Sequence, residues 1–140
     1  MARVCIIDDK EVMRASLADI LTGQGHEATA YADPQHALQE ISALQFDAIV
    51  SDLRMPGLDG IELLRTLRSR GVETPFILMT AFGTVPTAVE AMKLGAFDYI
   101  QKPFEADQIG LVVERAVTMG RLRGENEALR VAVRDLEGDA

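Results

Sequence analysis

The chain has 140 residues, of which 48% are hydrophobic and 26% are charged, so it can form one globular domain and is not wholly disordered. Its 22 acidic and 14 basic residues leave a net charge of −8, which repels phosphate backbones, so we expect this chain to bind no nucleic acid. The single cysteine excludes an internal disulfide and favours a cytoplasmic location, and no apolar run approaches the roughly 18 residues of a membrane span, so we expect no membrane association.

Five short apolar segments, each bounded by polar or turn residues, predict β-strands along the chain. They occupy residues 4–7, 28–31, 48–51, 76–80 and 97–100. Apolar residues at helical spacing lie between these segments, which indicates a strand–helix alternation throughout most of the chain.

The helices between the strands are marked by their first residues and their apolar faces. Asp33 before Pro34 is a typical N-cap and first helical residue, and Asp59 with Glu62 is a variant of the capping box. The apolar faces of the first three helices comprise Met13, Leu17, Ile20 and Leu21, then Ala37, Leu38, Ile41 and Leu44, then Ile61, Leu64 and Leu67. We expect the glycines beside the third start, Gly57 and Gly60, to serve turn geometry.

The last two helices differ from the others. The fourth, from about residue 84 to Gly95, offers mostly small inward-facing residues, so we expect weak anchoring. Its inward candidates are Ala88, Ala91 and Met92. The fifth begins near Glu105 and shows no stop before Gly138. The alternation predicts an α/β fold: a five-stranded parallel sheet of flavodoxin-like order 2-1-3-4-5, with helices on both faces and an extended last helix.

Polar side chains follow several of the predicted strands and should meet at one edge of the sheet. Asp8 and Asp9 follow the first strand, Asp52 follows the third, Thr80 ends the fourth and Lys102 comes two residues after the fifth. Clustered carboxylates repel one another unless a cation neutralises them, and Mg²⁺ suits a few carboxylates and waters. An aspartate beside such a metal and a lysine can attack a phosphoryl group, with a hydroxyl such as that of Thr80 bonding one of its oxygens.

These residues lie in an ordered set of motifs that resembles bacterial response-regulator receiver domains over about residues 3–118. The motifs are Asp8-Asp9 after an apolar strand, Asp52-Leu53-Arg54-Met55-Pro56-Gly57-Leu58-Asp59-Gly60, Thr80-Ala81, and Tyr99-Ile100-Gln101-Lys102-Pro103-Phe104. The resemblance implies phosphorylation of Asp52 by a sensor histidine kinase. It also implies that the domain catalyses only its own phosphorylation and dephosphorylation and is not otherwise an enzyme.

The same resemblance implies roles for the other site residues. Asp9, Asp52 and the backbone carbonyl of Arg54 would hold Mg²⁺, with Asp8 acting through water. Lys102 would contact the phosphoryl group, and Thr80 with Tyr99 would form the switch pair. In this family the peptide bond between Lys102 and Pro103 is cis.

The C-terminal region narrows the resemblance. A last helix that runs into Glu125, Asn126, Leu129 and Arg130 looks like the sigma-54-dependent activators of the nitrogen- and dicarboxylate-regulation type. This predicts a receiver domain over residues 1–118 and a linker helix over 119–140. The linker would lead to an ATPase domain and a DNA-binding domain outside this chain. A stand-alone phosphorelay receiver is the alternative.

The last helix carries a heptad pattern that predicts a parallel homodimer. The a positions are Val112, Met119, Asn126 and Val133, and the d positions are Arg115, Leu122, Leu129 and Leu136. One asparagine at an a position fixes the register of two-stranded coils, and Glu125 and Arg130 fall at the g and e positions that pair between chains. Gly120 and Gly124 fall at outer positions, where we expect no packing. Packing of this helix on its own domain or on the missing ATPase is the alternative.

Two other protein classes share part of this pattern. An aspartyl-phosphate phosphohydrolase of the haloacid-dehalogenase type uses a strand-end aspartate with Mg²⁺, but its first strand is followed by Asp-x-Asp rather than Asp8-Asp9. A flavodoxin needs a phosphate-binding loop after the first strand, where the acidic residues of this chain would repel phosphate. Turnover of a phosphate ester, or a bound flavin, would favour these alternatives.

Overall fold

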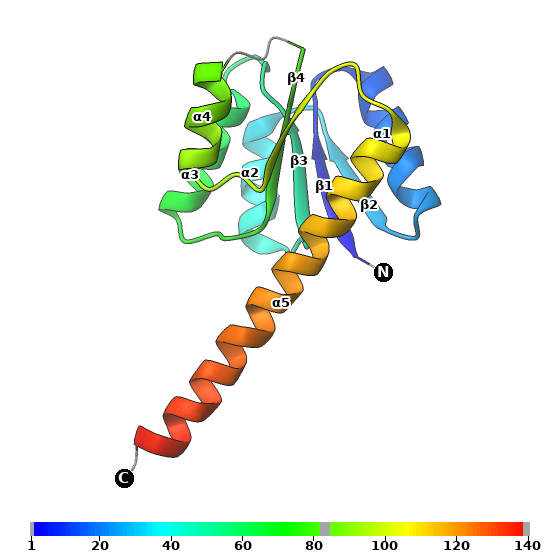
Figure 1. Ribbon diagram of the computed structural model, residues 1–140. Helices are drawn as coiled ribbons and strands as arrows, with labels where there is room; N and C mark the ends of the chain where they lie inside the picture. The colour runs from blue at the N-terminus through cyan, green and yellow to red at the C-terminus, as the bar shows by residue number, and fades with distance from the viewer. Residues whose placement is uncertain (1, 82–84, 139–140) are drawn as a thin grey trace.

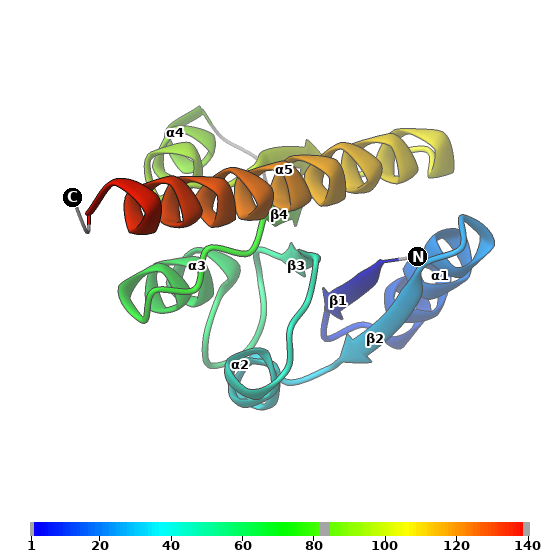
Figure 2. The same cartoon turned by 90° about the horizontal axis from the view of Figure 1, so that it is seen from below.

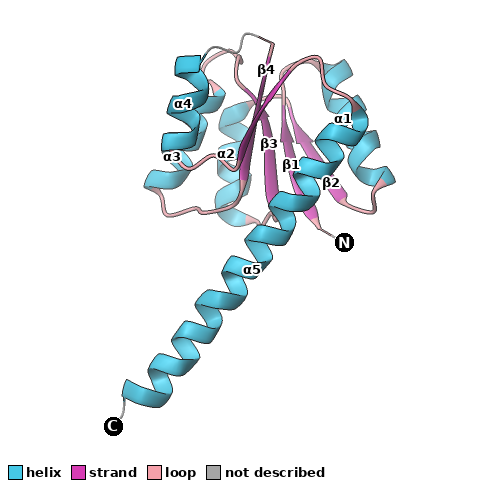
Figure 3. Cartoon of the chain, viewed as in Figure 1, coloured by secondary structure: helices cyan, strands magenta, loops and turns pink. Residues whose placement is uncertain are grey.

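The strands form one parallel sheet in the predicted order. The computed structural model describes residues 2–81 and 85–138, with side chains as far as Leu122. Within this part of the chain, five strands pair in parallel in the order β2-β1-β3-β4-β5 (Figures 1 and 3). The strands are β1 (Arg3–Ile7), β2 (Glu27–Tyr31), β3 (Ala48–Asp52), β4 (Phe76–Thr80) and β5 (Asp98–Gln101). The predicted fold class is therefore confirmed, and strand ends differ from the predicted ones by at most one residue.

Helices follow each strand and cover both faces of the sheet (Figure 2). They are α1 (Glu11–Gly23), α2 (Pro34–Ala43), α3 (Gly60–Ser69), α4 (Val85–Lys93) and α5 (Ala106–Gly138). Alternate residues along a strand point to opposite faces, so the sheet feeds two apolar cores. One core joins the sheet to α2, α3 and α4, and the other joins it to α1 and α5.

Two helix starts have the predicted caps. The Asp33 carboxylate accepts a hydrogen bond of 2.9 Å from the backbone N–H of Gln35, and the Asp59 carboxylate accepts one of 2.8 Å from that of Glu62. Each cap satisfies a backbone N–H that has no partner within its helix. The second cap fixes the start of α3 directly after the loop that follows Asp52.

The fourth helix is anchored by even fewer residues than the sequence predicts. Ala91 is its only fully buried residue, and the predicted inward residue Met92 is 50% exposed. On its other side α4 is tied to α3 by an ion pair of 2.7 Å between Arg65 and Glu90. Both partners are about half exposed, so this pair contributes little to stability, and α4 remains the least buried helix beside the site.

The last helix corrects two predictions. Val112 is 8% exposed and packs in the core shared with α1, so it cannot belong to a dimer seam. Gly120 does pack: a Cβ there would lie 3.1 Å from Cγ of Pro75, so the glycine lets α5 pass close to the start of β4. The other proposed seam residues fall into two groups. Met119 and Leu122 are about half exposed, and the side chains of Asn126, Leu129, Val133 and Leu136 lie outside the described residues.

Beyond the sheet, α5 continues as a single helix and projects away from the domain (Figure 1). None of the helices in the described ranges combines the length and apolar character that crossing a bilayer requires.

Candidate functional site

The carboxyl ends of β1, β3 and β5 bring the predicted acidic and basic residues together. Asp8 follows β1 directly, Asp52 is the last residue of β3, and Lys102 follows β5. Asp8, Asp9 and Asp52 each offer a carboxylate oxygen, and these oxygens all lie within 4.8 Å of one another. Asp8 and Asp52 are buried, whereas Asp9 is exposed at the mouth of the cluster. The joint placement expected from the strand ends is thus present in the structure.

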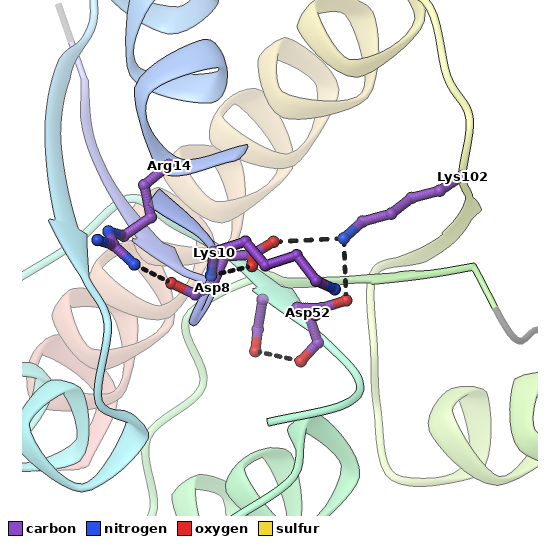
Figure 4. Close-up of polar contacts among 6 residues, drawn as sticks. Asp8, Lys10, Arg14, Asp52 and Lys102 are labelled. Carbon is purple, nitrogen blue, oxygen red and sulfur yellow. Dashed lines mark hydrogen bonds and ion pairs between the residues drawn. The ribbon is translucent and has the colours of Figure 1, made fainter. Parts of the chain in front are cut away.

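Lys102 bridges the two buried carboxylates. Its Nζ lies 3.1 Å from Oδ1 of Asp52 and 3.3 Å from Oδ2 of Asp8 (Figure 4). The lysine side chain is itself only 11% exposed, so these ion pairs are shielded from water. The Lys102–Pro103 peptide bond is cis.

The carboxylate of Asp52 is held in an unfavourable setting for a negative charge. Burial raises its pKa above the ordinary value, and the charge of Asp8 raises it further. Lys102 opposes this increase through its charge and its hydrogen bond, and the charge of Lys10 acts in the same direction as that of Lys102. Because the raising effects win, the site favours the arrival of a further cation or a proton.

The donor set fits a hard divalent cation. Carboxylate oxygens are ligands that Mg²⁺ prefers, and two of the three carboxylates here are buried although they repel each other. Lys102, the lysine in contact with the cluster, leaves the three carboxylates with an excess of negative charge, which a dication would offset.

Three supporting features were not predicted from the sequence. The backbone N–H of Lys10 donates a 2.9 Å hydrogen bond to Oδ1 of Asp8, and Nη1 of Arg14 donates one of 2.9 Å to the backbone carbonyl of Asp8 (Figure 4). The buried Ser51 hydroxyl donates a 3.0 Å bond to the backbone carbonyl of Asp52. Arg14 could have been noticed, since it stands one helical turn after the start of α1 and so faces the preceding loop.

The turn geometry predicted for Gly57 and Gly60 is present only at Gly57, and the role of Gly60 was missed. Gly57 has a φ of +85°, which is the expected turn geometry, but Gly60 has no positive φ. A Cβ on Gly60 would lie 2.6 Å from the backbone oxygen of Asp52 and 2.6 Å from Cδ1 of Leu78. Gly60 therefore allows the start of α3 to pack directly against the backbone of the acidic residue.

The predicted switch residues lie on neighbouring strands. Thr80 is buried at the end of β4, and Tyr99 is half-buried on β5. The register pairs Leu78 with Tyr99 and Thr80 with Gln101. Since residues two apart on a strand share a face, Thr80 and Tyr99 lie on one face of the sheet, the face that α4 covers. Arg54 follows the acidic strand end in an exposed position.

Comparison with known proteins places this site in a family. Residues 4–114 match the response regulator receiver domain. The chain is 43% identical over 126 residues to the transcriptional regulatory protein FixJ of Bradyrhizobium diazoefficiens, covering 90% of this chain and 62% of that protein. It is 38% identical over 129 residues to the C4-dicarboxylate transport transcriptional regulatory protein DctD of Rhizobium meliloti, covering 92% of this chain and 28% of that protein.

Solved structures agree. The beryllofluoride-activated NtrC4 receiver domain dimer superimposes with a TM-score of 0.81 at 32% identity, covering 86% of this chain and 99% of that one. The chain spans less than two thirds of the length of the curated relatives named above. The family match, the shared fold and the buried aspartate cluster together show that this chain belongs to the response-regulator receiver domains of two-component systems.

Proposed function

We propose that this receiver domain accepts a phosphoryl group on Asp52 from a sensor histidine kinase, in a reaction that depends on Mg²⁺. The observation that supports this most strongly is the buried Asp52 carboxylate, set between a second buried carboxylate and a lysine that contacts both. Asp52 ends a strand at the sheet edge where Asp9 is open to solvent, so a donor phosphoryl group can approach.

In the proposed transfer, a carboxylate oxygen of Asp52 forms a bond to phosphorus while the bond from phosphorus to the donor breaks. The leaving group, an imidazole nitrogen or an acetate oxygen, departs with the electron pair. Lys102 Nζ already bonds Oδ1 of Asp52 and is placed to neutralise charge on the phosphoryl oxygens. Asp9, Asp52 and the backbone carbonyl of Arg54 would hold Mg²⁺, with Asp8 acting through water. The bound ion supplies positive charge to those same oxygens.

The signal would pass through Thr80 and Tyr99. A phosphoryl group on Asp52 draws the Thr80 hydroxyl toward it, and Tyr99 turns into the space on the same face of the sheet. The helix on that face is α4, whose only fully buried residue is Ala91, so a small change at Thr80 can shift it between two packings. Amide hydrogen exchange is expected to change most over residues 85–95 on phosphorylation, and an even change over the whole domain would contradict this route.

The output would be carried by the projecting helix. We propose that α5 forms a parallel dimer through Met119, Leu122, Asn126, Leu129, Val133 and Leu136, and that phosphorylation acts through it on ATPase and DNA-binding domains in the full-length protein. Met119 and Leu122 are 54% and 48% exposed, which leaves apolar surface for a second chain to cover. The relatives that extend beyond this chain include regulators named for transcription.

Intact-mass measurement with acetyl phosphate and Mg²⁺ tests the chemistry without a kinase. One phosphoryl group should add to the wild type, and Asp52→Asn and Asp9→Ala should abolish the addition. Asp19→Asn, an exposed aspartate on α1, is the matched control and should behave as wild type. Undiminished phosphorylation of Asp52→Asn would falsify the assignment of the acceptor.

Sedimentation at micromolar concentration tests the dimer. Truncation after Thr118 and Leu129→Asp should both weaken association strongly. Val131→Asp is the matched control, because the heptad places Val131 on the outer side of the coil. A full chain that stays monomeric at high micromolar concentration with and without phosphorylation contradicts the coil.

A further inference from the structure

A second lysine reaches the acidic cluster from another element. Lys10 is the N-cap residue of α1, with an extended backbone at φ −96° and ψ 120°. Its backbone N–H is bonded to Asp8, and its side chain runs across Asp8 toward the carboxylate of Asp52 (Figure 4). Lys102 reaches the same carboxylate from the loop after β5, so the two ammonium groups approach Asp52 from different directions.

The two lysines are engaged differently. Lys102 is 11% exposed and pairs with both buried carboxylates. Lys10 is exposed, and within residues 2–81 and 85–122 its ammonium group takes part in no ion pair. The charge of Lys10 nevertheless acts on Asp52, where it favours the ionised form. Lys10 is therefore close enough to act on the site electrostatically while its donors remain available to a ligand.

The charges of the phosphorylated site balance only when Lys10 is counted. An aspartyl phosphate carries about two negative charges at neutral pH, and Asp8 and Asp9 add one each. Mg²⁺ and Lys102 together supply about three positive charges against these four. Lys10 supplies the fourth, and a buried or half-buried cluster is most stable when its charges cancel.

We propose that Lys10 is a further catalytic residue of this receiver domain, whose ammonium group contacts the phosphoryl oxygens during transfer and approaches them from a different direction than Lys102. The proposal rests on the proposed phosphorylation of Asp52. It implies that Lys10 accelerates transfer from dianionic donors. It also implies that Lys10 weakens Mg²⁺ binding before the donor arrives, because two cations that share one carboxylate cluster repel each other.

Removing the Lys10 charge should lower the rate of phosphoryl transfer but raise the affinity for Mg²⁺. A merely structural role would not change these two quantities in opposite directions. In Lys10→Gln, the initial rate of phosphorylation by acetyl phosphate at saturating Mg²⁺ should fall about three- to tenfold, as expected for one charge removed at contact distance in a partly solvated site. Titration calorimetry without donor should show Mg²⁺ binding about threefold tighter in the same variant. Lys10→Arg, which keeps the charge, should restore most of the rate. Lys93→Gln makes the same charge change on α4 and should alter neither quantity.

Three results would overturn the role of Lys10 while leaving the acceptor in place. The first is a Lys10→Gln rate equal to wild type, and the second is weaker Mg²⁺ binding together with a slower rate, which would indicate a disturbed Asp8 loop. The third is an equal rate loss in Lys93→Gln, which would indicate only an effect of net charge. Failure of the wild type itself to gain a phosphoryl group, or its persistence in Asp52→Asn, would instead overturn the function proposed for Asp52.

Discussion

Replacing Asp52 with asparagine should stabilise the domain in the absence of Mg²⁺. Asp52 is 3% exposed, and its carboxylate lies within 4.8 Å of two others. Asparagine keeps the shape and removes the charge. The variant that abolishes the proposed function is therefore expected to have a larger free energy of unfolding than the wild type, because the charge needed for the chemistry destabilises the folded state.

The size of this effect follows from the geometry of the cluster. Two unit charges 4.8 Å apart at an effective dielectric constant of about 20 repel by about 3.5 kcal/mol. The attraction to Lys102 offsets most of this and of the cost of burial. The pKa of Asp52 is still raised, so the unfavourable effects exceed the attraction. We expect a net gain of about 1–2 kcal/mol at pH 7, which corresponds to about 3–6 °C in Tm for a chain of this size.

The gain should depend on pH with a definite sign. A raised pKa means that the folded state binds the proton more tightly than the unfolded state does, so the contribution of Asp52 is most favourable at low pH and is lost as pH rises through the folded pKa. Asparagine does not titrate. The difference between variant and wild type should therefore be largest at neutral pH and should vanish below the ordinary aspartate value of 3.8.

Urea denaturation at pH 7 and pH 3.5, with and without 10 mM Mg²⁺ as an order-of-magnitude saturating concentration, measures this difference. Mg²⁺ should narrow it at pH 7, because the ion binds the wild-type carboxylates and neutralises their repulsion. Asp19→Asn controls for the loss of one surface charge. A destabilised Asp52→Asn at pH 7, or a gain of equal size at both pH values, would refute the reasoning.

Three further substitutions test the ion pairs and close contacts of the domain. Lys102→Met should destabilise the domain by about 3 kcal/mol at pH 7, because it leaves two buried carboxylates without their shared partner, and a loss below about 0.5 kcal/mol in denaturation would contradict this. Gly60→Ala should cost about 2 kcal/mol, because its Cβ would meet the Asp52 backbone and Leu78 at 2.6 Å, and Gly23→Ala, with nothing within 4 Å, should be close to neutral. Gly120→Val should shift the path of α5 past Pro75, seen as altered amide shifts at both segments, and unchanged shifts would contradict the contact.

The order of elements was determined by the sequence alone. The five apolar segments, the two aspartate caps and the strand–helix alternation each depend on residues that are neighbours along the chain, so their patterns can be found without tertiary information. The parallel topology then places residues that follow β1, β3 and β5 at one edge. For this reason the grouping of Asp8, Asp52 and Lys102 was predictable before any distance was known.

Only the tertiary structure decided which surface of the last helix is buried. Residues 106–138 carry more than one apolar stripe, and a periodic pattern cannot tell which stripe faces its own sheet. Val112, Val113 and Ala116 pack against the sheet and α1, so a heptad that begins at Val112 is wrong at its first position. Met119 and Leu122 remain about half exposed, although Gly120 between them packs against Pro75 at the start of β4.

Two close contacts made by glycines, and the reach of Lys10, were likewise decided by tertiary packing. Gly60 lets the chain pack closely against the Asp52 backbone, and Gly120 does the same against Pro75. Neither partner is adjacent to its glycine along the chain. A glycine in a sequence does not show whether it allows a turn or a close contact. The path of the Lys10 side chain across Asp8 has the same origin. Its position after two aspartates is a local fact, but its reach to Asp52 exists only because β1 pairs with β3 and brings the two strand ends side by side.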